Sequence, residues 1–232
     1  RRQRQMCIGD SKGFCWYQGC SNVGRSTHYA EKMVAMIDHW RALWGGERKP
    51  FYYVEIAPHE DGEENVNEAL VREQQARVMD MTDNVGMVCT NDLVYDYETW
   101  NVHPSRKEPI ARRLAYWALS RDYGYGDAVK TIGPRFRSME VLEGGVVRVH
   151  FDGSDCGFLV KGEIEGFELA GSDGVFRPAK AVRRRPDPTV LYVSNYDVGS
   201  PVYLRYNFKN CSVGRLWDAF GQPVVPFRTD NF

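Results

Sequence analysis

The sequence predicts an α/β unit with a parallel sheet, followed by an antiparallel β domain of the sandwich type. Through about residue 125, strand patterns alternate with helical patterns, which is typical of a parallel sheet covered by helices. After Gly133-Pro134, short runs of β-branched and aromatic residues are separated by Gly, Asp, Asn and Pro, which predicts antiparallel strands. We therefore expect two domains, at 1–132 and 133–232.

Three short apolar runs are the expected parallel strands, at 13–19, 51–57 and 85–93. A doubly wound sheet usually has about five strands or more, so three strands make up only part of such a sheet. Ligands in these sheets bind beyond the carboxyl ends of the strands. The loops that follow the three runs are therefore the places where function is expected.

Helical patterns lie between and after these strands. Residues 27–44 carry large apolar side chains on one helical face. Asn65 with Glu68, and Ser105 with Glu108, have the spacing of a capping box. We expect helices to begin at those two points.

The second domain contains no convincing helical pattern. Its strand patterns are five runs separated by turn-forming residues. These runs are 136–143, 146–151, 167–171, 190–194 and 202–208.

The overall composition gives no reason to expect nucleic acid or an anionic membrane as a partner. The chain is 43% hydrophobic and 26% charged, with a net charge of −1. The basic stretches at 1–4 and 183–185 are local, and we interpret them as solvated segments. No apolar run reaches the ~18–20 residues of a membrane helix. The chain lacks an initiator Met, and we expect that it begins partway through a longer product.

The six cysteines are scattered and form no CxxC pair, which argues against a zinc site. Buried free thiols are the preferred interpretation. One or two disulfides are the alternative.

His103 is the candidate general base, because it ends the loop after the run 85–93 and precedes a helix. A surface or helix-capping histidine is the alternative.

Gly19 and Asn22, in the turn GCSN, can supply a backbone N–H and a side-chain amide to an oxyanion hole. The alternative is an ordinary turn. Ser21 has a hydroxyl, but its surroundings lack the G-x-S-x-G pattern of a nucleophile elbow.

Six segments together resemble the sialate O-acetylesterase family of SGNH-type carbohydrate esterases. Members of that family read WYQGESN, then a helix ending in D-W-R, and then PFYYVQLAP, GMAVTxDL, IHPxxK and, in the β domain, GFEIAG. The matching segments here occur in the same order and cover essentially the whole chain. They are WYQGCSN, DHWRALWG, FYYVEIAP, GMVCTNDL, VHPSRK and GFELAG, and LRYNF at 204–208 and PFRTDN at 226–231 continue the resemblance to the end of the chain.

The resemblance implies a partial SGNH, flavodoxin-like, three-layer domain followed by the β-sandwich. It implies a carbohydrate O-acetylesterase that releases acetate from sugars such as O-acetylated sialic acid, through a serine/histidine acyl-enzyme mechanism with no metal or cofactor. His103 corresponds to the catalytic histidine, and Asn22 and Gly19 to the oxyanion hole. The family also implies a periplasmic or extracellular protein, with no nucleic-acid or membrane partner.

The nucleophilic serine of the family lies in a GQSN-type block well upstream of WYQGESN. Ser11, in the triplet GDS, is only five residues before Trp16, which leaves no room for the helix that should follow a nucleophile. We therefore expect the nucleophilic serine to lie upstream of Arg1, in the N-terminal half of the esterase. That half is the expected protein partner of this chain. A processed chain, a truncated relative, an inactive fragment and a non-catalytic carbohydrate-binding protein remain alternatives.

The chain departs from the family pattern at two places. Cys20 replaces the glutamate of GESN. The positions where an acid often supports the histidine hold Asn101 and Trp100, so a hydrogen bond from Asn101 can hold the ring but cannot stabilise the imidazolium by charge. Asp92 and Asp96 are the alternative supports. Tyr97 and Trp100 are candidate surfaces on which a sugar can stack.

Overall fold

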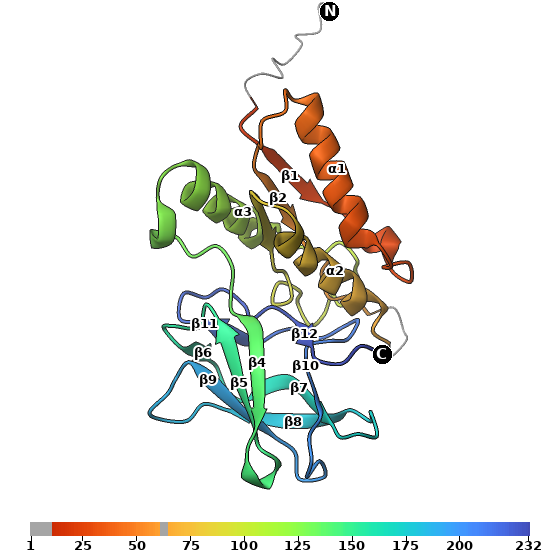
Figure 1. Cartoon of the computed structure of the whole chain (residues 1–232), viewed down its shortest axis with the longest axis vertical. Coiled ribbons are helices and arrows are strands. Elements are labelled where there is room, and N and C mark those ends of the chain that lie inside the picture. The colour runs from red at the N-terminus through yellow and green to blue at the C-terminus, as the bar shows by residue number, and fades with distance from the viewer. Residues whose placement is uncertain (1–10, 61–64) are drawn as a thin grey trace, which may run out of the picture.

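The computed structural model describes residues 11–60 and 65–232. Within these ranges a small parallel sheet with helices on both faces is followed by an antiparallel β domain (Figure 1). The predicted fold class is confirmed. Gly9 and Asp10 of the GDS triplet lie outside the described residues, whereas Ser11 lies within them.

The parallel sheet has the strand order β1-β2-β3, with β1 at Phe14–Tyr17, β2 at Phe51–Val54 and β3 at Val85–Val88. Phe51 is level with Phe14 on one side and with Val85 on the other. Each strand is shorter than its apolar run, because the last residues of each run leave the ladder and form the loops. These loops all emerge at one edge of the sheet.

Three α-helices cover the sheet: α1 (Tyr29–Leu43), α2 (Asn67–Met81) and α3 (Lys107–Asp122). Helices α1 and α2 share a core with Phe51 and Tyr53 on one face of the sheet. Helix α3 packs on the other face (Figure 1). In the described chain, no helix is both long enough and apolar enough to cross a membrane.

Helix α3 approaches the sheet closely because β3 carries a glycine. A Cβ atom at Gly86 would overlap the Trp117 ring. The Trp117 indole N–H donates to the Met87 carbonyl oxygen at 2.9 Å, and its ring stacks on Tyr52. The bulk of one tryptophan therefore fixes the distance between helix and sheet.

The two predicted capping boxes have different outcomes. At the start of α2, Asn65 Oδ1 accepts a hydrogen bond from the Asn67 N–H at 3.0 Å, while the Glu68 N–H donates to Asn210 Oδ1 at 2.9 Å. Helix α3 begins without a side-chain cap, and the Glu108 carboxylate accepts a hydrogen bond from Arg112 at 2.8 Å. The Ser105–Glu108 box therefore does not form, because an i,i+4 partner holds Glu108.

The β domain consists of a seven-stranded antiparallel sheet, in the order β12-β10-β7-β8-β9-β5-β4, and a two-stranded sheet, β11-β6. The strands are β4 (Arg135–Val141), β5 (Val147–Asp152), β6 (Phe158–Val160), β7 (Ile164–Ala170), β8 (Arg177–Val182), β9 (Val190–Ser194), β10 (Tyr203–Tyr206), β11 (Leu216–Asp218) and β12 (Phe227–Arg228). All five predicted runs contain a strand.

Four strands of this domain were not predicted. Strands β6, β11 and β12 have only two or three residues, which is too short for a periodic pattern. Strand β8 begins with Arg-Pro and contains Lys180, which weakens its strand signal. Short helical turns occur at Cys20–Asn22 (η2), Gly126–Ala128 (η3) and Glu143–Gly145 (η4). The domain limits 1–132 and 133–232 stay a prediction.

The described cysteines, Cys15, Cys20, Cys89, Cys156 and Cys211, are all free thiols. The expectation of buried thiols holds only for Cys89, since Cys15 and Cys156 are exposed.

A buried carboxylate joins the β domain to the parallel-sheet unit. Asp92, in the loop after β3, accepts two hydrogen bonds from the Arg113 guanidinium of α3, both at 2.7 Å. The Trp217 indole N–H of β11 donates to Asp92 Oδ2 at 2.8 Å. Since Asp92 and Arg113 are both buried, this ion pair is shielded from solvent and from salt.

We predict that Asp92→Asn destabilises the chain by about 3–5 kcal/mol, because the Arg113 charge would remain buried without its partner. Urea unfolding measures the change. Asp96→Asn is the matched control. Asp96 pairs with Arg215 at 3.2 Å on the surface, so its loss should cost at most about 1 kcal/mol. Equal effects of the two substitutions would contradict this account.

Candidate active site

A pocket of about 370 Å³ lies at the carboxyl end of β1 and contacts the loop that connects β3 to α3. Two of the sequence-predicted site residues, Gly19 and His103, both line it. The full lining is Tyr17, Gln18, Gly19, Cys20, Ser21, Val102, His103 and Lys107. The fold therefore brings together two segments that are far apart in the sequence, at the edge where ligands of parallel sheets bind.

The turn after β1 requires glycine at position 19. Gly19 has a φ of 150°, which a side chain disfavours. A Cβ atom there would lie 2.7 Å from the Ile56 side chain and 2.9 Å from Gln75 Nε2. The Gly19 carbonyl oxygen accepts a hydrogen bond from the Asn22 N–H at 2.8 Å. This bond closes the turn.

Gln75, on α2, holds the peptide that precedes Gly19. Its Nε2 donates to the Gln18 carbonyl oxygen at 3.0 Å, and its Oε1 accepts from the Ile56 N–H at 2.9 Å. The Tyr29 hydroxyl also donates to the Gln18 carbonyl oxygen, at 3.2 Å. The Gln18–Gly19 peptide is thus fixed from α1 and α2. Within the described residues, the N–H groups of Gly19 and Ser21 donate no hydrogen bond.

Sequence reasoning missed Gln75. A signal was available: Val71, Gln75 and Val78 follow helical spacing and all three are buried. A glutamine within such a stripe needs partners for both ends of its amide.

Asn22 does not line the pocket. Its side-chain oxygen accepts a hydrogen bond from Gln18 Nε2 at 2.8 Å, and the residue borders a separate hollow of about 150 Å³ beside Tyr29 and Trp16. The structure therefore brings together Gly19 and His103, and places the Asn22 side chain next to them but outside the pocket lining.

The loop before α3 presents His103 at the surface. Asn101 Oδ1 accepts a hydrogen bond from the His103 backbone N–H at 2.9 Å. Buried Glu98 accepts hydrogen bonds from the N–H groups of Ser105, at 3.1 Å, and Tyr95, at 3.3 Å. These bonds hold the backbone of the loop, and the His103 imidazole is exposed.

None of the expected supports reaches the imidazole within the described chain. The Asn101 oxygen is bonded to the backbone instead of the ring. The Trp100 indole N–H donates to the Tyr97 carbonyl oxygen. Asp92 is held by Arg113 and Trp217, and Asp96 is paired with Arg215. Among the described residues, no hydrogen bond joins Asn101, Asp92 or Asp96 to the His103 ring.

Ser11 lies at the other end of β1. It precedes the strand, whereas Gly19 follows it, and the Ser11 carbonyl oxygen accepts a hydrogen bond from Lys49 Nζ at 3.0 Å. Ser21 does line the pocket with His103. It belongs to the one-turn helix η2, and no hydrogen bond joins it to His103 in the part of the chain that the structure describes.

Buried charges lie behind this turn. Glu55 is fully buried, its pKa is raised by burial, and its Oε1 accepts a hydrogen bond from the Thr90 N–H at 2.7 Å. Burial lowers the pKa of Arg72, whose Nη1 lies 3.6 Å from Glu68 Oε2. His59 contacts the same Glu68 carboxylate. None of these groups lines the pocket.

Two groups in the pocket have raised pKa values. Burial, followed by the negative charge of Glu68, raises the pKa of the Cys20 thiol. Burial, with smaller contributions from Cys20 and Glu55, raises the pKa of the Tyr17 hydroxyl to about 12. Both groups are therefore protonated at neutral pH, and Cys20 is a poor thiolate nucleophile.

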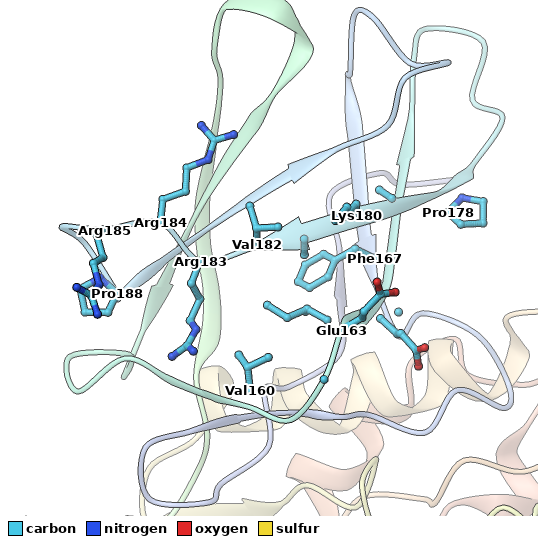
Figure 2. A pocket seen from close by; sticks show the side chains of 16 residues that line it. Val160, Glu163, Phe167, Pro178, Lys180, Val182, Arg183, Arg184, Arg185 and Pro188 are labelled. Carbon is cyan, nitrogen blue, oxygen red and sulfur yellow. The ribbon is translucent and has the colours of Figure 1, made fainter.

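A larger cavity of about 840 Å³ lies on the β domain, against β7 and β8. Figure 2 shows that Arg184 and Arg185 extend away from the apolar side chains of Phe167 and Val182, while Arg183 runs toward Val160. The cavity contains none of the predicted site residues, and its arginines do not converge on one point. Nor does any group of His, Cys, Asp and Glu among the described residues suit a metal ion.

Comparisons with known proteins indicate a carbohydrate esterase family. A family model described as "Carbohydrate esterase, sialic acid-specific acetylesterase" matches residues 1–119. A solved carbohydrate acetylesterase from Xanthomonas citri is similar, with a TM-score of 0.83 and 30% sequence identity. The match covers 95% of this chain and 51% of that one, so the chain spans about half the length of the solved relative. No curated protein matches it in sequence.

We predict that Gln75→Leu lowers the free energy of unfolding by about 1–3 kcal/mol for each buried group that loses its partner. Urea unfolding measures the change. Gln74→Leu is the control, because the Gln74 side chain takes part in no hydrogen bond among the described residues; it should change stability by less than about 0.5 kcal/mol or raise it. Similar losses in both variants would refute the specific role of Gln75.

Proposed function

This chain belongs to the sialic acid-specific acetylesterase family of carbohydrate esterases, and we propose that it supplies the histidine and oxyanion donors of a carbohydrate O-acetylesterase. The proposed substrate is an O-acetylated sugar such as sialic acid, and the product is acetate. The observation that carries this proposal is the single pocket lined by both Gly19 and His103.

In the proposed reaction, His103 removes the proton from a serine hydroxyl as the oxygen attacks the acetyl carbonyl carbon. The Gly19 N–H stabilises the oxyanion, because its peptide is held rigidly by Gln75 and donates to no described group. The second proposed donor is the Asn22 amide, which borders the neighbouring hollow and not this pocket, so it is proposed from the family resemblance alone. The sugar oxygen leaves with the proton from His103, and water then resolves the acetyl-enzyme with the same base.

We propose that the nucleophilic serine lies in a segment N-terminal to this chain. The placement of Ser11 at the amino end of β1, away from Gly19 and His103, supports this. Ser21 is the competing candidate because it lines the pocket. However, it lies in a one-turn helix directly after the strand, and a nucleophile elbow would continue into a longer helix.

Exposed aromatic residues next to His103 support a sugar substrate. Trp100 is 70% exposed and Tyr97 is 74% exposed, on the loop that ends at His103. Three residues span at most about 11 Å, so Trp100 is within the length of two sugar rings from His103. Flat exposed aromatic faces suit the apolar faces of sugar rings. A periplasmic or extracellular location is proposed from the family alone.

The test is acetate release from O-acetylated sialic acid by the protein encoded by the natural reading frame, extended upstream of Arg1. We predict that His103→Ala lowers kcat about 10³-fold or more. Ser21→Ala should change kcat less than about threefold, since the proposed nucleophile lies elsewhere.

The chain from Arg1 should not hydrolyse p-nitrophenyl acetate. A full loss of activity in Ser21→Ala would replace the proposed nucleophile with Ser21. An active His103→Ala variant would refute the proposed base.

A further inference from the structure

We propose that Lys107 recognises the carboxylate of an acidic sugar in the pocket that contains His103. This inference rests on the proposed function and assigns to one residue the recognition of the carboxylate that the proposed substrate carries.

Lys107 is placed in the pocket by two structural features. It is the first residue of α3, immediately after the loop that presents His103, and its side chain lines the same pocket. Its Nζ lies 5.4 Å from the centroid of the Tyr17 ring. A cation–π contact at this distance orients an ammonium group without neutralising it.

The positive charge of Lys107 is unpaired within the described chain, whereas the arginines near it have partners. Arg112 pairs with Glu108 at 2.8 Å and Arg113 with Asp92 at 2.7 Å. Lys107 itself forms no ion pair among the described residues. Glu98 is an acid whose charge interacts with Lys107, but its two oxygens accept hydrogen bonds from the N–H groups of Ser105 and Tyr95.

The pocket lining contains no aspartate or glutamate. Lys107 is the only lysine or arginine in this lining, so its positive charge attracts an anionic ligand. Its ammonium is a mobile point charge with three donors, which suits a carboxylate at the rim of a pocket. The Gly19 N–H is rigid and is the group suited to the oxyanion.

A volume of about 370 Å³ is at the small end of the range for ligand pockets. The segment that carries the proposed serine would add to this lining, so the charge of Lys107, and not the volume, is the basis for selecting the substrate. Lys107 then distinguishes an acidic monosaccharide from a neutral one of similar size.

The test compares Lys107→Gln with the parent on three acetyl esters, using the longer natural protein: O-acetylated sialic acid, an O-acetylated neutral hexose and p-nitrophenyl acetate. We predict that KM for the acidic sugar rises at least about tenfold, as expected for a lost charged hydrogen bond. For the two neutral esters, kcat/KM should stay within about twofold of the parent value. Lys107→Arg should retain most of the discrimination, because it keeps the charge.

Lys180→Gln, in β8 of the other domain, is the control for net charge. Added salt should weaken use of the acidic ester by the parent and have little effect in Lys107→Gln. Equal losses of kcat/KM on all three esters would assign Lys107 to the oxyanion and overturn the proposal. An unchanged KM for the acidic ester would also overturn it.

A binding measurement on the chain itself separates this proposal from the proposed function. Saturation-transfer NMR with unesterified sialic acid should show that the sugar contacts the parent chain and Lys180→Gln. The same contact should be absent in Lys107→Gln, whether or not any ester is hydrolysed. A neutral methyl hexoside should be bound equally by parent and variant. Undiminished contact of sialic acid with Lys107→Gln would refute the recognition role, even in an active esterase.

Discussion

The buried pair of Asp92 and Arg113 fixes the part of the molecule on which the candidate site depends. Asp92 begins the long loop that leads to His103, and Arg113 lies in the helix that follows that loop. Trp217 of the β domain donates to the same carboxylate. The start of the loop is therefore held by two contacts, one from the helix that follows the loop and one from the β domain. The imidazole at the far end of the loop stays exposed.

The other wall of the pocket is held by neutral groups. Gln75 and Tyr29 both donate to the carbonyl of the peptide that carries the Gly19 N–H. Hydrogen bonds to a peptide carbonyl polarise its N–H and make that N–H a better donor. The two walls are thus held by different means: a shielded ion pair behind the histidine, and an amide network behind the turn.

The parallel strands and the turn after β1 were predictable from the sequence, because short apolar runs carry a strong local signal and the first two runs end at a glycine or before a proline. Proximity of Gly19 and His103 followed from the rule that such loops share one edge of the sheet. The role of Asn101 was not predictable, because its oxygen caps a backbone N–H two residues away. Nothing in the spacing of Asn101 and His103 distinguishes that bond from one to the ring.

Long-range partners account for the other failures. Asn65 with Glu68 satisfies the capping-box spacing, yet the Glu68 N–H donates to the distant Asn210 side chain. Sequence spacing carries no information about such competition. Strands of two or three residues in the β domain exist only because neighbouring strands pair with them. No local sequence pattern therefore predicts these short strands.

The central claim is that the Gly19 turn and His103 form one ligand site. Titration of the chain with acetate, the proposed product, while recording ¹H–¹⁵N amide resonances, tests it most directly. The amide resonances of Gly19 and His103 should shift together, with one midpoint, and those of Phe167 beside the β-domain cavity should not move. Shifts confined to one of the two segments, or to the β domain, would contradict the claim.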